Sequence, residues 1–185
     1  MNMIQDQFLS LLRMFRPFGV GEIRVLAAAE LPEAAAALLV HNGDMTSRLE
    51  ALHADKVCLD VVNRSIADER GYFREVILRK ATDSRAVEYG VIEIVLGGFS
   101  RILQNEIEDG KVPLGGLLNR DGLGYFSEPQ CFFGLYPSEW MQEIFDGSDG
   151  CELYGRCNIL KRSDGMILAR IVEVLPSLRQ TTDAT

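Results

Sequence analysis

The sequence predicts an α+β protein with an antiparallel sheet of about six strands and helices packed on one side. Two observations support this class. Stretches with alternating apolar residues follow one another through short turns, and short connections pair strands antiparallel. These stretches come in two groups of three, each preceded by helical patterns. Strands and helices therefore do not alternate strictly, which disfavours a doubly wound parallel sheet.

The composition is that of a globular domain. The chain has 185 residues, 47% of them hydrophobic and 25% charged, so we expect one domain over residues 1–185. An N-terminal helix is expected within 1–16, and a polar, frayed tail at 179–185. The net charge of -8 argues against nucleic acid, whose phosphates require a basic surface.

Location and metal content are predicted from what the sequence lacks. No run of 18 apolar residues and no signal-peptide pattern is found, so we expect a cytoplasmic protein with no membrane partner. The four cysteines form no Cys-x-x-Cys pair. We therefore predict no metal site.

Helices are predicted from apolar spacing and from capping residues. Pro32 stands early in one helix, where its missing N–H does no harm, and Asp44 is a good N-cap for the next. The expected helices cover 3–15, 31–40, 45–53 and 99–107, with short ones after Pro113 and Ser138.

Strands are predicted from period-two alternation and from β-branched or aromatic content. The last two strands flank the tight turn Ser163-Asp-Gly165 and form the clearest hairpin. The expected strands cover 56–63, 71–79, 86–96, 130–136, 151–160 and 166–175.

Arg74 stands out in the second of these strands. Side chains alternate between the two faces of a strand, so Arg74 shares a face with Tyr72, Val76 and Leu78. A buried guanidinium is costly unless an anion meets it. The sequence therefore predicts an anionic partner for Arg74, either a protein carboxylate or a ligand.

Glu173 is a second charge on a strand face that otherwise resembles core. Its face in the last strand carries apolar residues at the other positions, namely Ile167, Ala169, Ile171 and Leu175. Two alternatives are open: Arg74 and Glu173 form a buried bridge, or each meets a ligand.

Of the other charges, Glu88 and Glu93 are expected to face solvent. Arg156 and Arg170 are expected to pair with acids across the last hairpin.

Four segments, in this order, resemble the chorismate lyase family in its divergent branch. They are the Met-Thr-x-Arg stretch, the Arg-bearing strand, the Pro-Leu-Gly turn and the closing strand with an acid near its end, at 43–50, 73–78, 112–115 and 166–176. The resemblance implies an antiparallel six-stranded sheet with a ligand pocket enclosed between sheet and helical flaps. The same architecture is shared by effector-binding domains of some bacterial transcription regulators.

The resemblance also implies a reaction and roles for four residues. Members of the family remove pyruvate from chorismate and leave 4-hydroxybenzoate, with neither metal nor organic cofactor. By position, Arg74 would grip the ring carboxylate, and backbone groups of Met45 and Leu114 would complete the cradle. Glu173 would be the catalytic residue, meeting the ring hydroxyl and assisting proton transfer.

One departure from the family leaves a second function open. The enterobacterial branch has another arginine in the strand after the Arg-bearing one, near the place of Gly90 in this sequence. The group that would hold the enolpyruvyl carboxylate is therefore not identified. The alternative is a non-catalytic sensor or carrier that binds a small anionic aromatic ligand.

Overall fold

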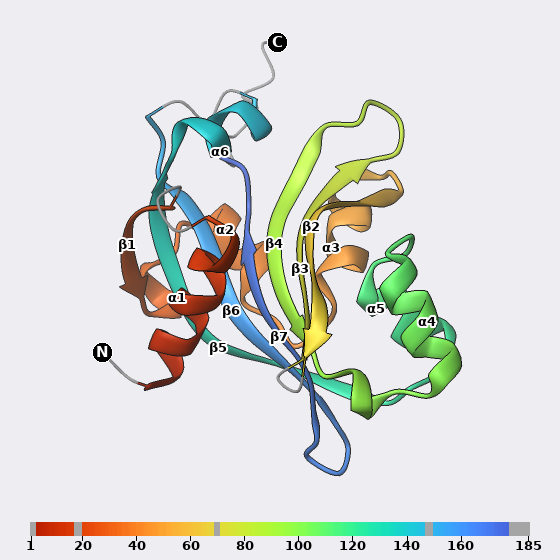
Figure 1. Cartoon of the computed structure of the whole chain (residues 1–185). Coiled ribbons are helices and arrows are strands. Elements are labelled where there is room, and N and C mark those ends of the chain that lie inside the picture. Colours follow the sequence, from red (N-terminus) through yellow and green to blue (C-terminus); the bar gives the residue numbers. More distant parts are fainter. Residues whose placement is uncertain (1–2, 17–19, 69–70, 147–149, 178–185) are drawn as a thin grey trace.

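A computed structural model describes residues 3–16, 20–68, 71–146 and 150–177. Within these residues, all strands join one antiparallel sheet in the order β1-β5-β6-β7-β4-β3-β2 (Figure 1). The α+β class and the antiparallel sheet are confirmed, and the expected tail at 179–185 lies outside the described residues. The strands are β1 (Val20–Leu26), β2 (Val57–Asp68), β3 (Gly71–Lys80), β4 (Ala86–Ile94), β5 (Tyr125–Pro137), β6 (Leu153–Arg162) and β7 (Ile167–Val174).

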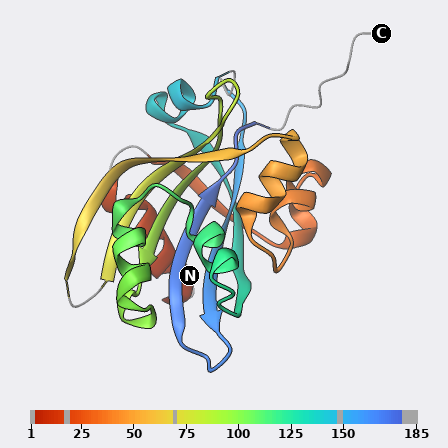
Figure 2. The ribbon, with the colours of Figure 1, turned by 90° about the vertical axis from the view of Figure 1, so that its right-hand side faces the viewer.

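The helices are arranged in two groups. Two pairs, α2 with α3 and α4 with α5, lie over one face of the sheet, one pair towards each side (Figure 2). On the opposite face α1 contacts β4 and β7. The predicted N-terminal helix therefore covers the face of the sheet that was expected to carry no helices. The helices are α1 (Met3–Phe15), α2 (Glu33–Leu39), α3 (Met45–His53), α4 (Arg101–Asp109), α5 (Leu114–Arg120) and α6 (Glu139–Ile144), with 3-10 turns at Ala28–Glu30 and Leu96–Gly98.

Three apolar clusters hold these layers together. One packs α1 and α6 against the sheet, and includes Phe8, Leu12 and Phe133. The other two lie on the opposite face, one under α4 and α5 and one under α2 and α3. A strip of sheet with charged residues runs between these last two clusters, beneath α3 and α5.

The starts of α3 and α5 are fixed to each other above this strip. Asp44 is the N-cap of α3, as predicted, and its Oδ1 accepts from the Ser47 N–H at 2.7 Å. Its Oδ2 accepts from Asn119 of α5 at 3.2 Å. Pro113 holds the N-cap position of α5 with φ -55°, the value to which its ring restricts it. Two helix starts thus form a roof over one part of the sheet.

The strand register lines up two neighbouring rows of side chains under that roof. One row runs Arg74, Ile92, Ile171, Asn158 across β3, β4, β7 and β6. The next runs Val76, Gly90, Glu173, Arg156 across the same strands. Strands lie ~4.8 Å apart and rise ~3.3 Å per residue, so Arg74 and Glu173 have Cα atoms ~12 Å apart. The register therefore places these two charges well apart on one face.

Gly155 provides a test of how closely the strands pack. A Cβ at this position would overlap the carbonyl oxygen of Glu173 and the ring of Phe133. We expect Gly155→Ala to lower the free energy of unfolding by about 1–3 kcal/mol, because overpacking forces the backbone to shift. Urea denaturation measures this. Gly124→Ala is the matched control: its added Cβ meets nothing within 4 Å, so a similar loss there would contradict the packing argument.

No helix in the described part of the chain combines the length and the apolar character needed to cross a membrane.

Candidate functional site

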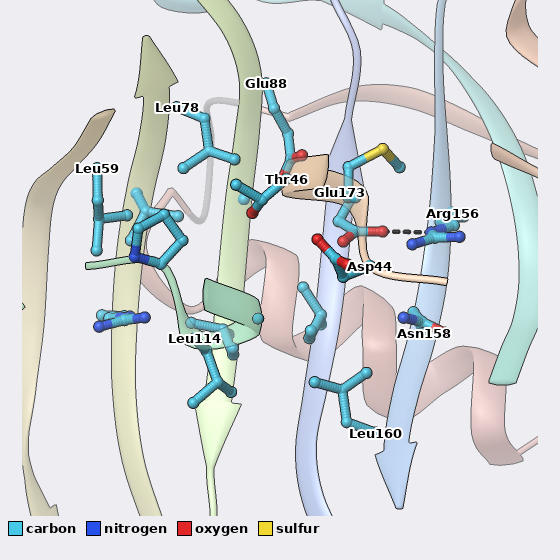
Figure 3. A pocket seen from close by; sticks show the side chains of 18 residues that line it. Asp44, Thr46, Leu59, Leu78, Glu88, Leu114, Arg156, Asn158, Leu160 and Glu173 are labelled. Atoms are coloured by element: carbon cyan, nitrogen blue, oxygen red, sulfur yellow. Dashed lines mark hydrogen bonds and ion pairs between the residues drawn. The ribbon is translucent and has the colours of Figure 1, made fainter. Parts of the chain in front are cut away.

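A cavity of about 70 Å³ lies between the sheet and the starts of α3 and α5 (Figure 3). It brings together all four residues that the resemblance implies, from four different elements. Most of its wall is apolar, and its polar side chains come from the central strands and the roof. The lining residues are Asp44, Met45, Thr46, Leu59, Arg74, Val76, Leu78, Glu88, Gly90, Ile92, Pro113, Leu114, Gly115, Arg156, Asn158, Leu160, Ile171 and Glu173.

Arg74 is a buried cation without a carboxylate partner among the described residues. It is 2% exposed, and its one hydrogen bond there runs from Nη1 to the Ile107 carbonyl at 3.2 Å. That carbonyl lies in the last turn of α4, where the helix dipole favours a cation. The Nε atom has no partner. Burial lowers the pKa of Arg74 to about 10, so the group is still charged at neutral pH.

The neighbouring residue Glu75 shows how this fold satisfies a buried charge when no ligand is involved. Glu75 points to the opposite face and is 0% exposed. Its carboxylate accepts from Arg16 at 2.9 Å, from Tyr89 at 2.9 Å and from Asn63 at 2.5 Å. Arg74, one residue away, lacks any such set, and this contrast marks it as a candidate ligand-binding group.

Met45 and Leu114 are the first residues of α3 and α5, and both line the cavity. The first N–H groups of a helix have no partner within the helix and attract anions. No side chain caps the start of α5. Backbone donors from two helices therefore surround the space next to the strip of sheet that carries Arg74.

Glu173 does not contact Arg74 but pairs with Arg156. The Arg156 Nε donates to Glu173 Oε2 directly across β6 and β7 (Figure 3). The Arg156 Nη1 donates at 3.1 Å to the carbonyls of Leu39 and His41. Burial, followed by the charge of Arg156, lowers the pKa of His41 to about 4, so this imidazole is neutral at pH 7. Of the two alternatives left open for Arg74 and Glu173, the direct bridge is therefore not formed, and the predicted cross-strand pairing of Arg156 with an acid is confirmed.

Glu88 is a second acid of the cavity, and the expectation that it faces solvent was wrong. It is 4% exposed and lines the cavity from β4, with its Oε2 unpartnered in the described structure. Burial and the charge of Glu173 raise its pKa well above the ordinary value. Residues two positions apart on a strand share a face, so Glu88 lies on the same face of β4 as Ile92 and Ile94. This alternation was the signal that could have placed Glu88 on the buried face. Glu93 is partly buried and pairs with Arg170 at 2.8 Å.

The raised pKa of Glu88 predicts a pH-dependent stability. In the unfolded chain this carboxyl loses its proton near pH 4.5, whereas the folded protein keeps the proton to higher pH. Folding therefore takes up a proton above that pH, and stability falls as the pH rises. Glu88→Gln, a neutral isostere, should gain relative to wild type by up to about 1.4 kcal/mol per pH unit within this window. Urea denaturation from about pH 4 to pH 8 measures the difference, and Glu93→Gln, whose acid is paired, should show no such gain.

Gly90 is near the place where the resemblance to the enterobacterial branch implies a second arginine. It lines the cavity, and a Cβ there would be 3.2 Å from Val76 Cγ2 and 3.4 Å from Glu88 Oε1. A larger side chain would have to displace both neighbours. The second arginine of this cavity instead comes from β6, as Arg156, and is already engaged by Glu173.

The fold is shared with two crystal structures from Mycobacterium smegmatis. The effector domain of PhnF is 12% identical at a TM-score of 0.55, covering 74% of this chain and 90% of that domain. A structure of PhnF is also 12% identical, at a TM-score of 0.56, covering 91% of this chain and 93% of that one. No family model and no curated protein sequence matches the chain. The likeness shows that this chain shares the fold of the PhnF effector domain.

Proposed function

We propose that this chain is a non-catalytic binding protein for a small aromatic carboxylate, with Arg74 as the group that holds the carboxylate. The proposal rests on the buried Arg74 guanidinium, whose Nε has no partner in the described residues. A ligand carboxylate would supply two oxygens for a charge-assisted pair. Backbone N–H groups of Met45 and Leu114 would complete the cradle, since both residues line the same cavity.

The comparison with PhnF supports a binding role. The matching part of that protein is called an effector domain, a name that describes a module responding to a bound molecule. An effector or carrier site needs affinity and selectivity but no group that transfers protons. Under this proposal, the geometry of the Arg74 cradle provides the affinity and the selectivity.

The lyase interpretation is the second candidate, favoured by the gathering of Arg74, Met45, Leu114 and Glu173 around one cavity. Two observations weigh against it. Glu173, which would assist proton transfer, already accepts a hydrogen bond from Arg156. Chorismate carries two carboxylates, whereas Arg74 is the only cation lining the cavity that lacks a carboxylate partner in the described residues.

Ligand size follows from the cavity. Its volume of about 70 Å³ is roughly half that of the ~150 Å³ cavity that holds benzene in another protein. An aromatic ring would therefore displace the roof formed by the starts of α3 and α5. The Asp44–Asn119 hydrogen bond that joins α3 to α5 is made by exposed side chains, whereas Met45 and Leu114 at the two helix starts belong to the buried apolar clusters.

The proposal is tested with purified protein and four compounds. Isothermal titration calorimetry with benzoate and 4-hydroxybenzoate should give saturable binding. Benzamide, the neutral isostere, should bind about 10- to 100-fold more weakly, because a hydrogen bond to a charged group contributes ~1.5–3 kcal/mol. In parallel, incubation with chorismate should release no pyruvate above the uncatalysed background.

The outcomes separate the two candidates. Carboxylate binding without pyruvate release supports the binding role. Pyruvate release that scales with protein concentration and is lost in Glu173→Gln would establish the lyase instead. Equal affinity for benzoate and benzamide would remove Arg74 as the anion receptor.

A further inference from the structure

The end of the cavity farthest from Arg74 carries more acid than base. Glu88 and Glu173 line it from β4 and β7, and Arg156 from β6 (Figure 3). Asp44 also lines the cavity, from its roof. Arg156 neutralises Glu173 through their ion pair, so Glu88 is left without a cation.

Glu88 is a carboxyl that the protein itself does not satisfy. Only 4% of its surface is exposed, and no hydrogen-bond donor of the described residues reaches its Oε2. A buried carboxyl normally has partners, as Glu75 does on the other face of the sheet. Glu88 lines a cavity that already has an unsatisfied cation, Arg74, in another part of the same wall.

We infer that the ligand of this cavity is zwitterionic, with a carboxylate held at Arg74 and a positively charged nitrogen held at Glu88 beside Glu173. The inference rests on the proposed carboxylate site and specifies its ligand class. An ammonium group would donate to Glu88 and to the free oxygen of Glu173. With Arg156 and both acids ionised, the added cation brings the charge of this end to zero.

The sheet register gives a spacing suited to such a ligand. Glu88 pairs with Leu78 on β3, four residues beyond Arg74, so the Cα atoms of Arg74 and Glu88 lie ~14 Å apart. Both residues line the cavity, and a ring between them fits once the roof formed by α3 and α5 is displaced. The wall of that space is apolar, formed by Val76, Leu78 and Ile92.

A neutral hydroxyl is the competing group at this end. It would leave Glu88 protonated, because burial and Glu173 raise the pKa of this carboxyl, and it would bind without proton exchange. A cation instead stabilises the ionised form of Glu88. Binding of a zwitterion should therefore release the proton that Glu88 carries in the free protein.

Three probes of nearly equal size distinguish these cases: 4-(aminomethyl)benzoate, 4-(hydroxymethyl)benzoate and 4-methylbenzoate. At neutral pH the first should bind at least tenfold more tightly than the other two. Calorimetry in phosphate and in Tris, whose ionisation enthalpies differ, should show proton release on binding of the aminomethyl compound alone.

Glu88→Gln supplies the matched variant, with a side chain of the same shape that carries no proton to lose. It should abolish the proton release and reduce the aminomethyl preference to less than about threefold, while 4-methylbenzoate binds as in wild type. Glu93→Gln, on the same strand but paired with Arg170, should leave both unchanged. Thermal melting checks that each variant is folded.

Failure of this inference is distinguishable from failure of the proposed function. If none of the three carboxylates binds, the proposed function itself is overturned. If all three bind equally, or the hydroxymethyl compound binds most tightly, the carboxylate site stands and the zwitterion is overturned. The same holds if Glu88→Gln retains the aminomethyl preference and the proton release.

Discussion

Replacing Arg74 by methionine is expected to weaken carboxylate binding at least about 30-fold while leaving the protein as stable as wild type or more stable. Removing one partner of a buried charge pair costs ~2–5 kcal/mol of binding free energy, and 2 kcal/mol is about 30-fold. In the free protein, however, Arg74 is an unpaired cation that is 2% exposed. Replacing a buried charge by an apolar side chain of similar volume is often neutral or stabilising. Calorimetry with benzoate and urea denaturation measure the two effects.

Arg79→Met is the control for Arg74→Met. Arg79 lies on the same strand, is only partly buried, and pairs with Asp60 at 3.1 Å. This substitution should leave benzoate affinity unchanged and alter the free energy of unfolding by less than about 1 kcal/mol. If Arg74→Met instead unfolded the protein and Arg79→Met did not, Arg74 would have a structural role and the ligand site would lose its main support.

The second large effect is expected at the buried Arg156–Glu173 pair. Arg156 is 0% exposed, and its substitution by methionine leaves Glu173, at 4% exposure, without its partner. It also removes the donor to the carbonyls of Leu39 and His41. Breaking a buried pair costs ~3–5 kcal/mol, so Arg156→Met should reduce the free energy of unfolding by that amount. The double variant Arg156→Met/Glu173→Met should recover most of the loss.

A partly exposed pair on the same sheet serves as the comparison. Arg170 and Glu93 lie 2.8 Å apart with side chains 28% and 16% exposed. Arg170→Met should cost less than about 1 kcal/mol, as is usual for such pairs. If the Arg156→Met/Glu173→Met variant lost the sum of its two single effects, the two side chains would not be coupled and the ion pair would contribute nothing of its own.

Most of the elements could be predicted from the sequence because local chemistry fixes them. The helix Met45–His53 agrees with the prediction of a helix from Met45 to about His53, because Asp44 caps its start. The strand β1 (Val20–Leu26) was missed. Its sequence, Val-Gly-Glu-Ile-Arg-Val-Leu, contains a glycine and two charges, and it is a strand because β5 pairs with it.

The candidate site was predicted in part, for a similar reason. Arg74 and Glu173 were found because each is a lone charge in an apolar alternating row, a signal that needs only one strand. Arg156 was noticed only as a cross-strand partner, because its burial depends on the helices that cover β6. Glu88 was assigned to solvent because its strand carries other charges. Its true surroundings depend on β7 bringing Glu173 next to it.

The roof over the cavity also governs how fast a ligand exchanges. Because an aromatic ring is larger than the present space, its entry requires the start of α3 to move away from α5, which includes breaking the Asp44–Asn119 hydrogen bond. Motions of this kind take microseconds to milliseconds. Association should therefore be slower than diffusion allows, and an occupied cavity should stay occupied long after the free ligand has been removed. Asn119→Ala, which removes this hydrogen bond to Asp44 and leaves Arg74, Glu88 and Glu173 in place, should shorten that residence time without changing which ligand is selected.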